Sequence, residues 1–183
     1  MARIIAKGKF IQLMDDESWE YADRPRSAGV ASIVATYRGS PILVEQFRFS
    51  LRRDVIALPG GLIERARGGG TEESALSAAR RELAEETGFA AARMRKVAQG
   101  ALSPGTTSET LTLFIASGLK KLSHPTGDGD ERLRLHLVDL KKLHGWLAAR
   151  ERRGALVDCM VYAGLYFLGR HRTSGPTHNP KRA

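Results

Sequence analysis

The sequence predicts a mixed α/β sandwich, and two observations lead to that fold class. Segments with a strand pattern lie on both sides of one strongly patterned helix, and two further helical segments follow it. The length of 183 residues, with 42% hydrophobic and 27% charged residues, suits one folded domain with a full core. We divide the chain into a short N-terminal β arm at residues 1–28, a main domain at 29–169, and a basic tail at 170–183 that we expect to be disordered.

The strands are predicted from apolar runs that end at turn residues. In the first 28 residues, short apolar or aromatic pieces are broken by acidic residues and by Pro25, which indicates the β arm. Two strong strands, Gly29–Tyr37 and Ile42–Phe49, are separated by turn residues at 38–41. Three further strands are expected at Val55–Leu58, 110–117 and 132–137.

The best helix pattern in the sequence runs over Thr71–Thr87. Thr71 can cap its start, Glu72 and Glu73 would lie in its first turn, where the helix dipole favours anions, and Gly88 would end it. Two more helices are expected near the C-terminus, at Leu140–Ala149 with Asp139 as its cap, and at Ala155–Leu168.

The formal charge of +9 and the sequence pI of about 10.1 suit an anionic partner: a nucleotide, a nucleic acid or an acidic membrane surface. The cations are spread along the chain and into the tail, so we favour a basic solvated surface over a nucleic-acid site. The longest uncharged apolar run, Cys159–Gly169, is too short to cross a membrane, and charges at the start argue against an export signal. The single cysteine excludes an internal disulfide and a multi-cysteine zinc site, and we expect a cytoplasmic protein.

The helix at 71–87 carries the chemistry. At 100° per residue, Leu76, Ala79 and Leu83 form an apolar stripe that faces the core, and three glutamates share one sector beside it: Glu82, Glu85 and Glu86. Such carboxylates repel one another, and a hard divalent cation such as Mg²⁺ relieves that repulsion. An ordinary solvated Glu/Arg face is the alternative, and only the spacing of the residues separates the two.

The spacing matches a family motif. The residues Arg81–Phe89 agree, at every fixed position, with the second half of the Nudix box, Gx5Ex7REUxEExGU, where U is a bulky apolar residue. Glu73 stands eight residues before Arg81, as the box requires. The five fixed positions from Arg81 to Gly88 would coincide by chance at roughly one in a million starting points. The chain therefore resembles a Nudix hydrolase.

This resemblance implies a Nudix-type α/β/α sandwich with a mixed β-sheet, and hydrolysis of a nucleoside diphosphate linked to another moiety. It makes Glu82, Glu85 and Glu86 the carboxylates for Mg²⁺ or Mn²⁺, Arg81 the residue that orients them, and the Gly60 carbonyl a backbone ligand. The box glycine is expected at position 67, which is an arginine here, so Gly61 is its equivalent and residues 65–70 are an insertion. The insertion is either a surface bulge or a loop whose arginines reach a phosphate.

Further stretches are similar to the ADP-ribose pyrophosphatase branch of that family: Val44–Arg48, Leu58–Gly61, and the segment Ser103–Gly105. The resemblance implies hydrolysis of ADP-ribose to AMP and ribose 5-phosphate by a homodimer. The residues that it places at the substrate are Arg48 on the diphosphate, Trp19 and Tyr21 of the arm on adenine, and Pro104 and Glu109 in a marker loop. Each of these residues also has an ordinary structural interpretation, as a surface cation, a core or interface aromatic, or a turn residue.

The general base is left open by the sequence. The resemblance favours Glu131, in the acidic stretch at 127–132, and a glutamate of the helix is the alternative. Three other functions stay in view: hydrolysis of another nucleotide sugar or of a dinucleotide compound, action on RNA 5′ ends, and a non-catalytic nucleotide-sensing module.

Overall fold

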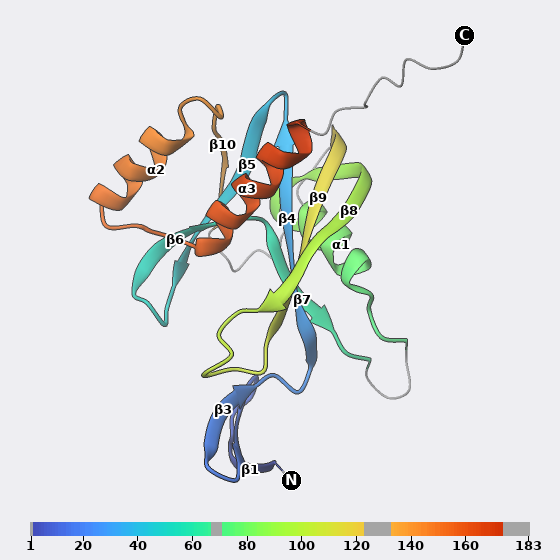
Figure 1. The fold of residues 1–183 in the computed structure, drawn as a ribbon, viewed down its shortest axis with the longest axis vertical. Coiled ribbons are helices and arrows are strands. Elements are labelled where there is room, and N and C mark those ends of the chain that lie inside the picture. Colours follow the sequence, from blue (N-terminus) through green and yellow to red (C-terminus); the bar gives the residue numbers. More distant parts are fainter. Residues whose placement is uncertain (1, 67–70, 123–132, 174–183) are drawn as a thin grey trace.

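The computed structural model describes residues 2–66, 71–122 and 133–173. Its main sheet follows the order β11-β6-β5-β4-β9-β8, with β10 paired to β5 and β7 paired to β4 (Figure 1). The β4–β9 and β6–β11 pairs are parallel and the other pairs are antiparallel, which confirms the predicted mixed sheet. The strands of this sheet are β4 (Ser27–Tyr37), β5 (Ser40–Arg48), β6 (Arg53–Ala57), β7 (Gly60–Glu64), β8 (Phe89–Ala101), β9 (Thr110–Lys121), β10 (Arg134–Leu137) and β11 (Leu156–Val157).

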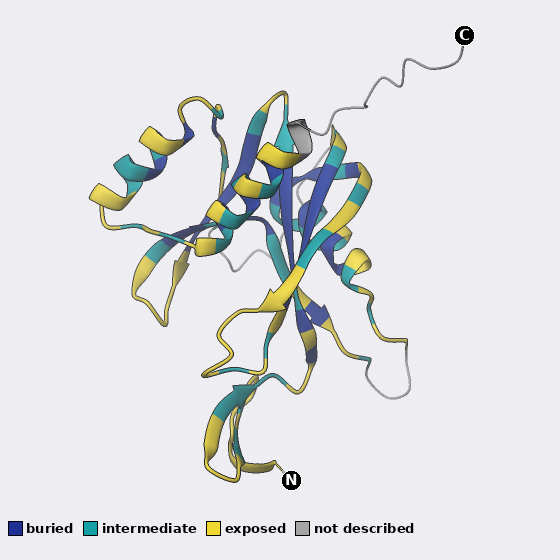
Figure 2. Ribbon diagram, viewed as in Figure 1, coloured by how far each residue is buried: buried dark blue, intermediate teal, exposed yellow. Residues whose placement is uncertain are grey.

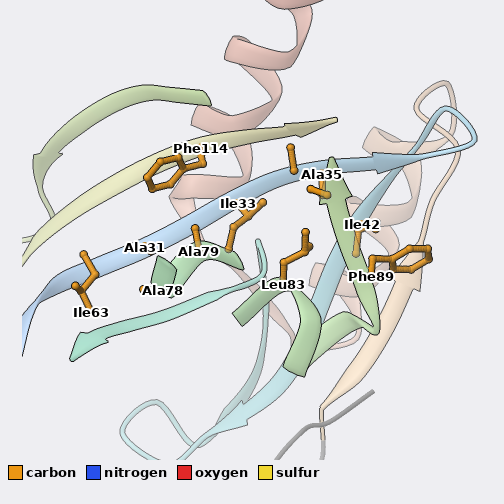
Figure 3. Close-up of a cluster of buried hydrophobic side chains, with 12 residues drawn as sticks. Ala31, Ile33, Ala35, Ile42, Ile63, Ala78, Ala79, Leu83, Phe89 and Phe114 are labelled. Atoms are coloured by element: carbon orange, nitrogen blue, oxygen red, sulfur yellow. The ribbon is translucent and has the colours of Figure 1, made fainter. Parts of the chain in front are cut away.

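Helices cover both faces of the sheet, so the predicted sandwich is confirmed. On β4, the neighbours Ile33 and Val34 point to opposite faces, as strand geometry requires, and each belongs to a different buried cluster. The Ile33 cluster packs against α1 (Ala75–Thr87), whose Leu83 is fully buried there (Figure 3). The Val34 cluster packs against α2 (Leu143–Arg152) and α3 (Cys159–Thr173). Among the described helices, none is both long enough and apolar enough to cross a membrane.

The first strands form a separate antiparallel sheet of β1 (Arg3–Lys7), β2 (Gln12–Asp16) and β3 (Trp19–Asp23). Figure 2 shows that this arm extends from the main domain and is coloured almost wholly as exposed or intermediate. Its base is held by the loop between β8 and β9: the Ala22 amide donates to the Thr106 carbonyl (2.8 Å) and the Ser108 amide donates to the Ala22 carbonyl (3.1 Å).

Helix α1 begins four residues later than the sequence predicts. The cap is Ser74, whose hydroxyl accepts from the Ser77 amide at 3.1 Å, and the predicted cap at Thr71 is wrong. Leu76 is 40% exposed, whereas the two small residues Ala78 and Ala79 are fully buried and let the helix approach the sheet closely. The predicted end of the helix is confirmed by its left-handed C-cap glycine at position 88.

The C-terminal helices also differ from the prediction at their starts. Asp139 does not cap α2: its carboxylate accepts from the Lys141 amide, in a turn that precedes the helix. Leu156–Val157 form a parallel strand beside β6 instead of the first turn of α3. Helix α3 continues to Thr173, past residue 169, where the sequence placed the start of the tail. Residues 174–183 lie outside the described part of the chain.

Candidate active site

Arg81, on the exposed side of α1, is the centre of the carboxylate cluster. One of its terminal nitrogens, Nη1, donates to Glu82 Oε1 at 2.8 Å and to Glu85 Oε2 at 3.0 Å. Its Nη2 donates to the Leu62 carbonyl of β7 at 3.0 Å. The guanidinium therefore fixes two carboxylates of the helix and ties the helix to the neighbouring strand.

Glu73 completes the set of Arg81 partners. Its Oε1 accepts from Arg81 Nε at 3.1 Å and its Oε2 from Arg81 Nη2 at 3.2 Å, a two-point ion pair. Glu73 Oε2 also accepts from the Glu64 amide at 3.0 Å. Glu73 thus lies before the helix, not in its first turn as predicted, and it links α1 to the end of β7.

The first two residues of β7 are glycines at positions that leave no space for a Cβ. A Cβ at Gly61 would overlap the Glu82 carboxylate, and a Cβ at Gly60 would overlap the Ala31 carbonyl of β4. The Gly60 amide donates to Glu86 Oε2 at 2.8 Å, so the third glutamate reaches this strand. The structure therefore brings the Gly60 amide and Gly61 to the carboxylates, and the metal-ligand role of the Gly60 carbonyl stays a prediction.

Burial and pairing act in opposite directions on the charges of this site. Burial raises the pKa of Glu82 above its usual value, although the nearby Arg81 opposes the shift. Burial would also raise the pKa of Glu73, but hydrogen bonds from Arg81 and from the Glu64 amide outweigh it and lower that pKa. The hydrogen bond to Glu73 is the largest contribution that raises the pKa of Arg81, which stays a cation.

The donor set of the cluster suits a hard divalent cation. Glu82, Glu85 and Glu86 supply carboxylate oxygens within two turns of one rigid helix, and oxygen is the ligand that Mg²⁺ takes in proteins. In the conformation that the structure describes, two of these groups turn toward Arg81 and the third toward β7. Within the described ranges, no three His, Cys, Asp or Glu side chains converge on one point as metal ligands do. The residues thus fit a metal by chemistry, and binding would require the three side chains to reorient.

Arg48 lies at the exposed end of β5, and strand alternation gives its face. Ile42 of the same strand belongs to the cluster packed against α1, and Arg48 is six residues farther along. Arg48 therefore points to the sheet face that carries the glutamates. A diphosphate bound beside the glutamates would lie on the same face as Arg48, and the predicted contact between them stays a prediction.

The residues predicted to hold the nucleoside lie on strand β3 and on the loop between β8 and β9. Strand β3 carries an exposed Trp19 and a half-buried Tyr21, and it is hydrogen-bonded to the loop that contains Pro104. Glu109, at the end of that loop, pairs with Arg24 at 2.5 Å. This ion pair lines a cavity of about 100 Å³ between the arm, β4 and the residue that follows β7, Arg65.

Sequence reasoning missed Arg24 as a lining residue, considered Arg65 only as one of the arginines of the insertion, and gave Glu73 a place in the motif but no partner. The first two belong to turns, where nothing in the local pattern distinguishes them from solvated cations. The spacing of Glu73 from Arg81 marked it as a motif residue. Its ion pair with Arg81 could not be predicted, because it depends on the helix beginning after Glu73. The predicted base Glu131 and the glycines of the insertion at 68–70 lie outside the described residues.

Comparisons with known proteins show which sequences and which fold the chain resembles. A sequence model described as NUDIX domain matches residues 24–156. A methanol dehydrogenase activator from Bacillus methanolicus is 35% identical over 115 residues, 62% of this chain and 56% of that protein. An ADP-ribose pyrophosphatase from Bacillus subtilis (strain 168) is 34% identical over 123 residues, 67% of this chain and 63% of that protein. The chain thus spans about three fifths of the length of these curated relatives.

One solved structure similar to the fold described here is a crystal structure of an ADP compounds hydrolase. It superposes with a TM-score of 0.62 and covers 81% of this chain and 80% of that chain. The sequence identity is 20%, so this likeness concerns the fold.

Proposed function

The chain belongs to the NUDIX domain family, and from that membership we propose that it is a metal-dependent hydrolase of nucleoside diphosphates linked to another moiety. The substrate that we favour is ADP-ribose, cleaved to AMP and ribose 5-phosphate. The observation that carries the proposal is the row of glutamates on α1: Arg81 holds Glu82 and Glu85, and the Gly60 amide of β7 holds Glu86. Two relatives named ADP-ribose pyrophosphatase, from Bacillus subtilis and Mycobacterium tuberculosis, support the choice of substrate.

Glu82, Glu85 and Glu86 would hold Mg²⁺, with Mn²⁺ as the alternative. When bound, such a cation neutralises charge that develops on the diphosphate and makes a bound water more acidic. Arg81 positions Glu82 and Glu85 through the two hydrogen bonds from Nη1. Because the Glu82 side chain is 14% exposed and burial disfavours its charge, a nearby cation would stabilise that charge.

The reaction itself is a substitution at phosphorus. A water oxygen forms a bond to one phosphorus, the bond from that phosphorus to the bridging oxygen breaks, and the bridging oxygen leaves with the other phosphate. A carboxylate takes the water proton; we assign this role to Glu131, with a glutamate of α1 as the alternative. Arg48 would bind the non-bridging oxygens in two-point fashion.

The arm and the marker loop would hold the adenosine. Trp19 and Tyr21 offer aromatic rings on β3, and backbone hydrogen bonds couple that strand to the loop of Pro104 and Glu109. Aromatic faces stack on nucleobases. We further propose that the protein is a cytoplasmic homodimer. The dimer is supported by the apolar side chains that the arm exposes: Ile4, Ile5, Phe10, Ile11, Leu13 and Trp19.

A substrate panel with Mg²⁺ tests the proposal. ADP-ribose, another nucleotide sugar, a dinucleotide polyphosphate, NADH and a 5′-capped RNA are offered separately, and products are separated by ion-exchange chromatography. We expect kcat/KM for ADP-ribose to exceed the others by at least about tenfold. Greater turnover of another compound would overturn the choice of substrate, and no turnover of any compound would favour a nucleotide-sensing module.

A further inference from the structure

A second cavity lies on the other face of the sheet, away from the glutamates of α1. It encloses about 460 Å³ between the β5–β6 hairpin, the start of β10 and the end of α2. Glu45 lines it and points to the same sheet face as Leu43, two residues earlier on β5, which belongs to the cluster packed against α2 and α3. In Figure 1, β10 and α2 lie on the side of the central strands away from α1.

The walls of this cavity are dominated by arginines, five of them: Arg52, Arg53, Arg134, Arg150 and Arg153. Two acidic residues, Glu45 and Asp54, also line it, so the lining residues that the structure describes carry a formal surplus of three positive charges (five minus two). Like charges held together in a concave surface repel one another and concentrate anions from solution. The cavity thus attracts negative charge.

A buried carboxylate anchors two of the arginines. The Glu45 side chain is 3% exposed and accepts from Arg134 Nη2 at 2.9 Å, and its second oxygen lies 3.3 Å from Arg150 Nη2. His136 Nε2 lies 2.6 Å from the same oxygen, and Arg134 also donates to Asp54 at 2.7 Å. Glu45 and Asp54 are therefore both paired with arginines, and the guanidiniums of Arg134 and Arg150 are held in place before any ligand binds.

The other three arginines are not neutralised in this way. Among the described residues, no side-chain hydrogen bond or ion pair holds Arg52, Arg53 or Arg153, and all three side chains are exposed at the rim of the cavity. Each guanidinium is a planar fork that matches the oxygens of a phosphate. Phe47, 43% exposed, adds an apolar wall against which a flat ring can pack.

We propose that this cavity is a second anion site, which binds a small molecule that carries at least two phosphate charges. The volume is within the range of small-ligand pockets, and a concave site of this size suits a compact anion better than an extended polynucleotide. Inorganic pyrophosphate and a nucleoside diphosphate share this chemistry. The site needs no metal, because the arginines themselves supply the positive charge.

The test is binding in the presence of EDTA, measured by isothermal titration calorimetry with pyrophosphate, ADP and a 12-nucleotide RNA as separate probes. The pocket variant is Arg52→Asn with Arg153→Gln; asparagine suits the left-handed backbone at position 52 (φ 54°). The matched control, Arg93→Gln with Lys120→Gln, removes two exposed cations from the β8–β9 pair. Circular dichroism checks that each variant is folded.

We expect the wild type to bind pyrophosphate or ADP at one site per chain, the pocket variant to bind at least tenfold more weakly, and the control to change by less than twofold. Glu86→Gln should bind as the wild type does, which separates this site from the proposed catalytic one. If ADP binds more tightly than pyrophosphate, the ligand is a nucleotide; the reverse order identifies the inorganic anion. The proposal is overturned if both double variants weaken binding equally, if Glu86→Gln abolishes it, if neither anion binds, or if only RNA does.

Discussion

Arg81 makes five hydrogen bonds, to three carboxylates and one backbone carbonyl, and no other residue type has this reach. A guanidinium has several N–H donors at fixed angles, so Arg81 can bond Glu73 and Glu85 at the same time through different nitrogens and orient both. The arginine therefore acts as a positioning residue for the proposed metal site.

Replacing Arg81 by lysine keeps the charge and loses the fork. We expect Arg81→Lys to lower kcat/KM for the substrate by about 10²-fold, because small displacements of catalytic groups have effects of that size. The melting temperature should fall by a few degrees. Steady-state kinetics and thermal unfolding measure both quantities. Arg80→Lys, one residue away on the same helix, is the control and should keep nearly full activity; equal losses in the two variants would contradict the role of Arg81.

Glu86 is tested by a change that keeps its shape. The amide oxygen in Glu86→Gln can still accept from the Gly60 amide, so the fold should persist, whereas a negatively charged donor is lost. We expect kcat to fall by at least about 10²-fold and added Mg²⁺ to raise the melting temperature less than in the wild type. Glu72→Gln, an exposed glutamate just before the helix, should behave as the wild type. A fully active Glu86→Gln enzyme would refute the assignment of this residue as a metal ligand.

At the scale of the element, the fit of α1 against β7 sets the space for the carboxylates. We expect Gly61→Ala to displace the Glu82 carboxylate, which a Cβ would overlap, and to lower kcat/KM by at least about tenfold. Gly100→Ala on β8 is the matched control, because its Cβ would meet no atom within 4 Å. Steady-state kinetics on the two purified variants measure this effect. Similar activities would contradict the prediction, because they would mean that β7 and α1 can move apart to accommodate the Cβ without loss of activity.

The elements also divide into those that local sequence specifies and those that it does not. Helix α1 follows from its motif, yet Thr71 and Ser74 can both cap a helix, and only packing against β7 selects Ser74. Strand β8 was not predicted, because its exposed cations near Arg93 resemble a solvated charge cluster. Strand β7 begins with two glycines, which have low strand propensity, and forms because β4 lies beside it.

The candidate site divides in the same way. The identities of Arg81, Glu82, Glu85 and Glu86 could be predicted from spacing along one helix, since neighbours on a helix are neighbours in sequence. The hydrogen bond between Glu86 and the Gly60 amide joins residues 26 apart, and the Leu62 carbonyl reaches Arg81 across 19. Such contacts depend on how the elements pack, which a local pattern does not record.

For the whole molecule, the distribution of charge matters more than its sum. The net charge of +9 alone was compatible with a solvated surface. The fold gathers five arginines from β5–β6, β10 and α2 into one concave surface, while the acidic residues of α1 gather on the opposite face of the sheet. The molecule therefore has a negatively charged proposed metal site on one face and a positively charged cavity on the other.

The exposed arm is the part of the molecule that we propose as the contact between two subunits. Its apolar side chains are too many for a free surface sheet, and burying them against a second copy would contribute to the roughly 800 Å² per partner that a stable dimer needs. We expect size-exclusion chromatography with light scattering to give twice the 20.0 kDa mass of the chain. The double variant Ile5→Asp with Ile11→Asp should be monomeric, because it places charges in that interface. Phe49→Asp, an 80% exposed aromatic on the β5–β6 hairpin, is the control and should stay dimeric. A monomeric wild type, or a dimer that survives both aspartates, would exclude the arm as the contact between subunits.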